Sequence, residues 1–238
     1  MSRSVAIIQS HYVPWAGFFD LIGGCTDVVI LDSVAFSKNS FFNRNRLAGP
    51  NGDFWITIPV VTHGREGQSI SEVKIQDAKW ASKHAKSVEQ SLCRTPFYAE
   101  YSASWLSVYQ ECLSSNSLSE INRLWLDCVV NQLNLKVKIH NDTDLVISET
   151  EKTERLVQLC QQLNADVYRT GPRGLAYLDI SRFNSTGTSV EVIEYSDYYP
   201  YRKARDSQVE PVSILDNLAN LGPATPELFQ HSFREART

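Results

Sequence analysis

Two short apolar runs open the chain. Residues 4–9 read SVAIIQ and residues 27–36 read DVVILDSVAF. Continuous runs of β-branched residues are typical of strands that are buried on both faces of a parallel sheet. Between them, residues 18–25 read FFDLIGGC and predict a short helix that ends at Gly23 and Gly24. A strand, a helix and a strand in this order predict a right-handed βαβ unit.

The next segment predicts a β-hairpin over residues 37–61. Its centre reads GPNGD, and Asn51-Gly52 suits the positive φ angles of a tight turn. The return strand is expected at FWITIPVV. A polar loop over residues 62–69 follows, and ISEVKIQ, residues 70–76, predicts another short strand.

From Trp80 the apolar positions recur with the helical period. Three helices are predicted, over residues 79–94, 95–113 and 118–135, and Ser119 is the expected N-cap of the third. They form a helical middle segment between the strands at the two ends of the chain.

The last third returns to alternating strands and helices. Strands are predicted at residues 138–148, 166–171 and 190–196, and helices at residues 150–165 and 212–222. Thr150 or Thr153 lies near the start of the first of these helices. Ser213 and Asp216 have the spacing of a capping box at the start of the second.

This organisation indicates one α/β domain over residues 1–238 with a mostly parallel sheet, because no repeat or Gly/Ser-rich linker divides the chain. With 23 Lys and Arg against 27 Asp and Glu, the formal net charge is −4, which argues against general nucleic-acid binding. No stretch approaches the roughly 20 apolar residues of a membrane span. The first residues also lack the apolar run of a signal peptide, so we expect a cytoplasmic protein.

The chain shows no cofactor signature. The five cysteines are widely spaced without a CxxC motif, which is neither a disulfide framework nor a zinc pattern. The histidines are scattered, without HxH or HExxH, so no metal site is predicted. Neither a Walker A sequence nor a GxSxG elbow occurs, and the sequence does not identify a cofactor.

The stretch QSHYVPWAGFFDLI follows the first strand, where ligands bind in α/β sheets. Gln9, Tyr12 and Gly17 are candidate substrate contacts in it, and Gly17 permits a close backbone approach. His11 is the titratable group of this loop and a candidate general base or acid near neutral pH. The alternative for His11, a hydrogen-bonded loop residue, is the more frequent role of a lone histidine.

The stretch NRNRL places arginines and asparagines on opposite faces of a strand. Arg44 and Arg46 point one way and Asn43 and Asn45 the other. Two guanidinium groups on one face suit a phosphate, a pyrophosphate or a carboxylate, and Lys38 lies just upstream. A solvated edge strand that charge keeps soluble is the alternative.

Two later stretches carry weaker signals. TGPRGLAYLD frames Arg173 with Gly171 and Gly174, which suits a loop around a ligand or a tight turn. YSDYYPYRK gathers aromatic and basic residues that either stack on a ring or pack over the core.

Together these stretches resemble one family. The opening run AIIQSHYVPWAGFFDLI…DVVILDSVAFSKNSFFNRNRL…WITIPV, with ERLVQLCQQLNADVYRTGPRGLAYLD and PVSILDNLANLG, is similar to the WbqC-like proteins over nearly the whole chain. The chain departs from the usual Gln-Pro-Tyr at Gln9-Ser10-His11, and Asp32 stands alone where paired acids are usual. The residues that the resemblance carries over are Gln9, Pro14, Gly17, Asp32, Lys38, Asn43, Arg44, Asn45, Arg46, Trp55, Pro59, Gly171, Tyr177, Asp179, Ser213 and Asp216.

The resemblance implies a role in the biosynthesis of surface polysaccharides such as O-antigen or lipopolysaccharide, without a settled reaction. The loop after the first strand also has the layout of the P-x-H-x-G-H loop of nucleotidyltransferases, with Trp15 and Phe18 where the two histidines would stand. By this analogy the fold is a nucleotidyltransferase-like, Rossmann-type α/β sheet without the phosphate-contacting imidazoles.

Three functions remain open from the sequence. The first is a transferase that moves an acyl or aminoacyl group to an amino sugar or a similar activated small molecule, with Asp32 or His11 as base. The expected partners are an anionic or nucleotide-linked small-molecule substrate and a carrier or biosynthetic partner protein. The second is a nucleotide-dependent ligase or nucleotidyltransferase of altered mechanism. The third is a non-catalytic binding protein in a biosynthetic complex.

Overall fold

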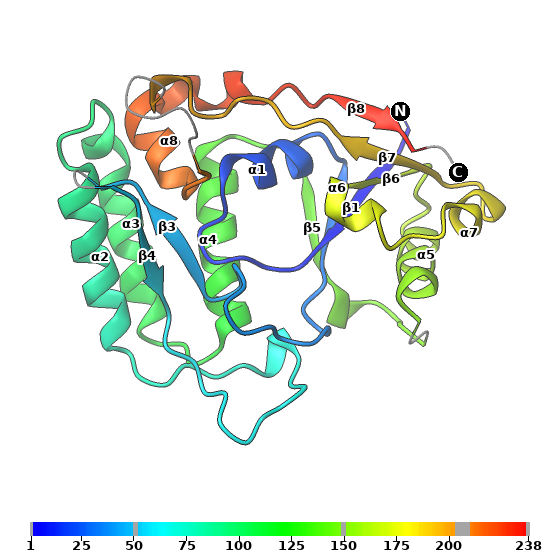
Figure 1. Ribbon diagram of the computed structural model, residues 1–238, viewed down its shortest axis with the longest axis horizontal. Coiled ribbons are helices and arrows are strands. Elements are labelled where there is room, and N and C mark those ends of the chain that lie inside the picture. The colour runs from blue at the N-terminus through cyan, green and yellow to red at the C-terminus, as the bar shows by residue number, and fades with distance from the viewer. Residues whose placement is uncertain (1, 50–51, 149–150, 203–209, 237–238) are drawn as a thin grey trace.

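A six-stranded sheet runs through the molecule (Figure 1). The computed structural model describes residues 2–49, 52–148, 151–202 and 210–236. The spatial order of the strands is β5 (Lys138–Asn141), β2 (Asp27–Ile30), β1 (Ser4–Ile8), β6 (Val167–Thr170), β7 (Ser189–Ile193) and β8 (Phe233–Glu235). The first five are mutually parallel, and only β8 pairs antiparallel. This confirms the mostly parallel, Rossmann-type α/β class.

The central strands are buried on both faces because their alternate side chains enter two separate cores. Ala6, Val28 and Ile30 point into one core, whereas Val5 and Val29 point into the other. Residues of α1 (Ala16–Gly23), α2 (Lys79–Leu92), α3 (Tyr98–Cys112), α4 (Leu118–Gln132) and α8 (Ile214–Leu221) supply the first core. The helices α5 (Lys152–Gln162) and α7 (Ile180–Ser185) cover the opposite face.

The helical middle segment is confirmed, and it packs through large aromatic side chains. Trp80, Trp105 and Trp125 come from α2, α3 and α4, and each is at most 3% exposed. The N-cap of α4 is Ser117, whose side chain accepts from the Glu120 amide. The prediction of Ser119 as the N-cap was wrong, because the helix begins at Leu118 and Ser119 lies in its first turn.

The hairpin is confirmed as β3 (Arg44–Leu47) paired antiparallel with β4 (Phe54–Thr57), separate from the large sheet. Gly52 has a φ of 114°, as the turn requires, and Asn51 lies outside the described residues. The predicted alternation holds, since Asn43 and Asn45 are buried.

Several boundaries differ from the prediction. Residues 70–76 do not form a strand: Ile70–Glu72 is a 3-10 turn, η1, that a Ser69–Glu72 capping box holds. The strand expected over residues 138–148 ends at Asn141, where the 3-10 turn η2 (Asp142–Asp144) begins. In the first case, local side-chain capping of the backbone replaces the hydrogen bonds of a strand.

The stretch TGPRGLAYLD, residues 170–179, forms one short helix, α6 (Pro172–Leu175), rather than one tight turn, and its last residue, Asp179, is the N-cap of α7. The helix α5 begins at Lys152 with Glu151 as its N-cap, so Thr153 lies near its start as predicted, and Thr150 lies outside the described residues. The antiparallel edge strand β8, after the 3-10 segments η3 (Pro200–Arg202) and η4 (Gly222–Leu228), was not predicted.

Ser213 caps α8 as predicted, accepting from the Leu215 amide. Asp216 does not complete a capping box. Its carboxylate accepts from the Tyr201 hydroxyl at 2.8 Å and from the Asn220 amide at 3.3 Å. Asp216 therefore connects α8 to Tyr201, in the aromatic stretch that precedes the helix.

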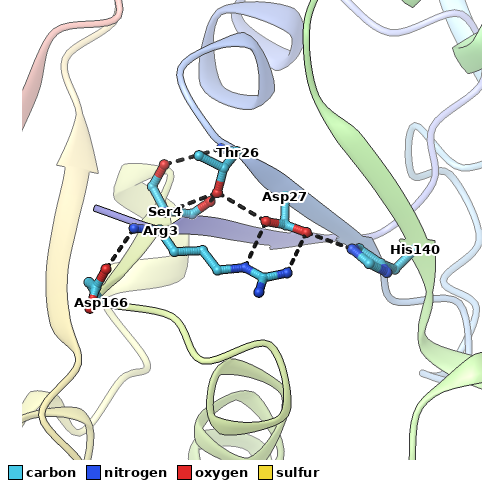
Figure 2. A network of polar contacts seen from close by, with 6 residues as sticks. All are labelled: Arg3, Ser4, Thr26, Asp27, His140 and Asp166. Carbon is cyan, nitrogen blue, oxygen red and sulfur yellow. Dashed lines mark hydrogen bonds and ion pairs between the residues drawn. The ribbon is translucent and has the colours of Figure 1, made fainter. Parts of the chain in front are cut away.

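A polar network joins three strands near their amino ends (Figure 2). The Asp27 carboxylate accepts from Arg3 Nε and Nη2 at 3.0 Å each and from Thr26 Oγ1 at 3.0 Å, and it meets His140 Nε2 at 2.8 Å. Asp166 accepts from the Arg3 amide at 2.6 Å. At this end of the sheet the Asp27 carboxylate is therefore paired with the Arg3 guanidinium group.

Candidate functional site

Asp32 lies directly beyond the carboxyl end of β2. Its carboxylate accepts from the Ser10 amide at 2.9 Å and from the Ser119 hydroxyl, which belongs to the first turn of α4. The side chain is buried, with the residue 4% exposed. Burial raises the pKa of Asp32 above its usual value, although these hydrogen bonds oppose the shift.

A second carboxylate, Asp142, follows β5, the strand beside β2. The two acids lie at matching ends, because Ile30 pairs with Asn141 in the register of these strands. Asp142 is 1% exposed, and its Oδ2 accepts from the Ser33 amide at 2.9 Å. Its Oδ1 has no hydrogen-bond partner among the described residues. The charge of Asp142 also contributes to the raised pKa of Asp32.

Asp32 and Asp142 line a pocket of about 530 Å³ between the ends of β2 and β5 and the start of α4. Hydroxyl groups dominate the remaining polar lining, which includes Ser71, Ser115, Ser117, Ser119 and Thr143. The lining also holds Arg123, whose Nε donates to Asp127 at 2.8 Å and whose Nη1 donates to Asn141 at 2.9 Å. Because Asp127 offsets the charge of Arg123, the pocket suits a polyhydroxylated or amine-bearing ligand better than an anion.

His11 is half-buried among three phenylalanine rings. Its ring centroid is 5.6 Å from that of Phe18, 6.1 Å from Phe41 and 5.8 Å from Phe42. Desolvation lowers the pKa of His11 to about 4, so the imidazole is neutral at pH 7. Desolvation therefore weakens His11 as a proton acceptor near neutral pH.

Two other candidates of the opening loop have packing roles. Tyr12 is fully buried, and its hydroxyl contacts His84 Nδ1 at 3.0 Å and the Tyr109 hydroxyl at 3.1 Å. Its side chain therefore cannot contact a substrate in this structure. Gly17 lies in α1 beneath the Trp15 ring, where a Cβ atom would collide with the indole. Gln9 is half-buried at the end of β1.

The asparagines of the hairpin hold the backbone. Asn43 Nδ2 donates to the Ile58 carbonyl at 2.8 Å. Asn45 Nδ2 donates to the Val13 carbonyl at 2.6 Å and to the Tyr12 carbonyl at 3.2 Å, so it attaches the opening loop to β3. Their placement gives both residues a structural role.

The arginines of the hairpin lie against Trp55, on the face opposite the asparagines. The Arg44 guanidinium carbon is 4.2 Å from the Trp55 ring centroid, and that of Arg46 is 5.5 Å away. We call Arg44, Arg46 and Trp55 the Arg–Trp face. None of its members lines the Asp32 pocket, and Lys38 is exposed on the preceding loop.

The candidates after β6 lie away from the pocket lining. Gly171 is the N-cap of α6, where a Cβ atom would come within 3.0 Å of the Tyr195 hydroxyl. Tyr177 is 76% exposed beneath the Lys152 ammonium group. Asp179 is the N-cap of α7, and its carboxylate accepts from the Ser181 amide at 3.0 Å. This capping contact accounts for an aspartate at this position.

Sequence reasoning missed Asp142, Ser119 and Asn122 as site residues. Asn122 Nδ2 donates to Ser10 Oγ at 3.0 Å and to the Phe42 carbonyl at 2.9 Å, so it connects α4 to the loop beside Asp32. The run KIHND carried a signal, because an acid directly after a short strand marks the ligand-binding end of a parallel sheet. The serines carried none, since the start of α4 is far from Asp32 in sequence.

Among the described residues, no helix is long and apolar enough to cross a membrane. The described residues also hold no group of three or more His, Cys, Asp or Glu side chains arranged to bind a metal ion.

The fold and the pocket define a mostly parallel α/β protein with a pocket at the carboxyl ends of its strands that carboxylate and hydroxyl groups help to line. The model of the WbqC-like protein family matches residues 9–227. The protein Rv1507c of Mycobacterium tuberculosis (strain ATCC 25618 / H37Rv), described as uncharacterized, is 35% identical over 230 residues, which cover 96% of this chain and 98% of that protein. The chain therefore belongs to the WbqC-like family. No solved structure matches it.

Proposed function

We propose that the protein is a biosynthetic transferase whose acceptor binds in the Asp32 pocket. The observation that carries the proposal is a buried carboxylate of raised pKa in a cavity rich in hydroxyl groups and acids. Such a cavity favours an acceptor with hydroxyl and amino groups, such as an amino sugar or a similar activated small molecule. The family's association with polysaccharide biosynthesis agrees with that class of acceptor. The proposal places the protein in the cytoplasm.

Asp32 acts as the general base. The acceptor's amine or hydroxyl donates to the carboxylate and attacks the carbonyl carbon of an acyl or aminoacyl donor. The proton passes to Asp32 as the new bond forms, and the leaving group departs with the electron pair of the broken bond. Ser10 and Ser119 hold the carboxylate in place, and the uncommitted Oδ1 of Asp142 accepts a second hydrogen bond from the acceptor.

The first test is the change of Asp32 to asparagine, which keeps the shape of the side chain and removes the base. A thermal-shift screen with nucleotides, nucleotide-linked amino sugars, acyl-CoA thioesters and amino acids identifies ligands, because binding at about 100 times Kd adds roughly 2.7 kcal/mol of stability. Product formation from the ligands found is then followed by mass spectrometry. We expect Asp32→Asn to lower kcat by at least about 100-fold, within the usual range for a general base.

Two variants sharpen this experiment. Glu89→Gln makes the same carboxylate-to-amide change on the exposed face of α2 and should keep full activity. His11→Gln should lose far less activity than Asp32→Asn, because the proposal assigns proton transfer to Asp32. Full turnover by a folded Asp32→Asn variant would refute the proposal. Pyrophosphate release from a nucleoside triphosphate would instead favour the ligase or nucleotidyltransferase, and partner binding without any turnover would favour the non-catalytic protein.

A further inference from the structure

The Arg–Trp face displays two guanidinium groups on one side of the hairpin. Arg46 lies directly opposite Trp55 in the β3–β4 register, and Arg44 is two residues along on the same face. Trp55 is 44% exposed, and its ring centroid lies 5.7 Å from that of Phe41. The face therefore combines fixed positive charge with an accessible aromatic ring.

The two guanidinium groups are incompletely paired. Arg44 Nη2 donates to the Asn39 carbonyl, and Arg46 Nη2 contacts Glu210 Oε2 at 2.7 Å. The Nε atoms of both arginines are buried and have no acceptor in the described part of the chain. An N–H group that has lost water without gaining an acceptor costs free energy, so the described protein atoms do not fully satisfy the two guanidinium groups.

Glu210 neutralises Arg46 from an exposed position. The Arg46 side chain is 18% exposed, whereas the Glu210 side chain is 67% exposed. A partly buried arginine requires a counter-ion, but an ion pair with so exposed a carboxylate is weak and readily exchanged. The carboxylate of Glu210 thus occupies the position that an anionic group of a ligand would take.

We propose that the Arg–Trp face binds the diphosphate group of a nucleoside diphosphate in place of Glu210. A diphosphate offers oxygens to both guanidinium groups at once. Trp55 and Phe41 offer the base or sugar an apolar surface on which to stack. The face shares no residue with the Asp32 pocket, so this inference goes beyond the proposed transfer reaction and does not depend on it.

The test is equilibrium binding by isothermal titration calorimetry at low salt, with inorganic pyrophosphate, uridine and adenosine diphosphates, and the two nucleosides as probes. We expect the nucleoside diphosphates to bind more tightly than pyrophosphate, and the nucleosides to bind weakly. Arg46→Ala should weaken diphosphate binding at least tenfold. Glu210→Gln should strengthen it several-fold, because it removes the competing carboxylate without adding a contact.

Arg94→Ala removes an exposed arginine at the end of α2 and serves as the matched control, with unchanged binding expected. Arg46→Lys keeps the charge and guards against a fold defect in the alanine variant, and it should also bind less tightly. Unchanged or weaker binding by a folded Glu210→Gln variant would overturn the proposal. Equal affinities for pyrophosphate and the nucleoside diphosphates would overturn the stacking role of Trp55.

This experiment is independent of turnover. Asp32→Asn should bind diphosphate as the wild-type protein does, so failure of the anion site and failure of the proposed base are separate results.

Discussion

At the scale of single residues, the sheet separates two kinds of aspartate by their surroundings. Asp27, near the amino ends of the strands, accepts hydrogen bonds from Arg3, His140 and Thr26, and these contacts outweigh the effect of burial and lower its pKa to about 2. Asp32, at the carboxyl end, accepts hydrogen bonds from an amide and a hydroxyl, and burial raises its pKa. The first carboxylate stabilises the fold, and the second is the base that we propose.

Asp27 should make stability depend on pH in the acid range. Its pKa is about 2 in the folded protein and 3.8 ordinarily, so its contribution is present above about pH 4 and is lost as the pH falls toward 2. The shift corresponds to about 2 kcal/mol. We expect Asp27→Asn to be less stable than the wild type by about this amount at pH 6, with the difference shrinking below pH 4.

Urea unfolding at pH 6, 4 and 3 measures this difference. Asp144→Asn, on an exposed turn after β5, is the control and should leave the free energy of unfolding nearly unchanged. A difference between Asp27→Asn and wild type that stayed constant across these pH values would contradict the assignment.

At the scale of elements, one buried amide connects the hairpin to the loop that carries His11. Asn45 is 1% exposed, and its side chain satisfies two loop carbonyls while its Oδ1 accepts from the Arg46 amide at 2.8 Å. The hairpin is outside the large sheet, so this contact helps to set the position of the Arg–Trp face.

Asn45→Ala should destabilise the protein by about 2–3 kcal/mol, because it leaves buried carbonyl groups without a donor. Thr57→Ala, an exposed change on the paired strand of the same hairpin, should stay within about 0.5 kcal/mol of wild type. Chemical denaturation measures the free energy of unfolding of both variants. Equal stabilities of the two variants would show that the amide does not hold the loop.

At the scale of the whole molecule, the C-terminal segment is attached to the first helix through a buried carboxylate. Asp20, in α1, is fully buried and accepts from the Tyr198 hydroxyl at 2.6 Å and from the His231 amide at 2.9 Å. His231 Nδ1 lies 3.0 Å from Asp20 Oδ1, and hydrogen bonding to Asp20 raises the pKa of His231. Asp20 and His231 lie more than 200 positions apart in sequence, and their contact connects α1 to the C-terminal segment.

This contact should weaken in alkali. A raised pKa means that the His231 contribution is complete below the ordinary value of 6.5 and is lost as the pH rises through the folded-state pKa. We expect His231→Asn, which tolerates the local φ of 47°, to lower Tm at pH 6 and to lower it less at pH 9. Thermal melts of the variant and the wild type at pH 6 and pH 9 measure this difference. An equal loss of Tm at the two pH values would argue against a charged imidazole.

The elements followed from local patterns, whereas their ends often did not. Continuous apolar runs predicted β1 and β2, and helical periodicity predicted α2, α3 and α4, because burial on two faces or on one stripe leaves a local signature. Residues 70–76 and the start of α4 were misjudged, because a capping box at Ser69–Glu72 and a cap at Ser117 depend on precise local geometry. The edge strand β8 is three residues long and exists through its pairing with β7.

The sequence by itself determined the α/β class, the family, Asp32 as a candidate at a strand end, and the division of arginines and asparagines across the hairpin. These features depend on periodicity and strand order, which neighbouring residues encode. Only the tertiary structure decided that Asp142 and Ser119 join Asp32, that His11 lies among phenylalanine rings, that Tyr12 is in the core, and that Glu210 pairs with Arg46. Each of these outcomes depends on contacts between distant segments, and burial and charge at a site arise from such contacts.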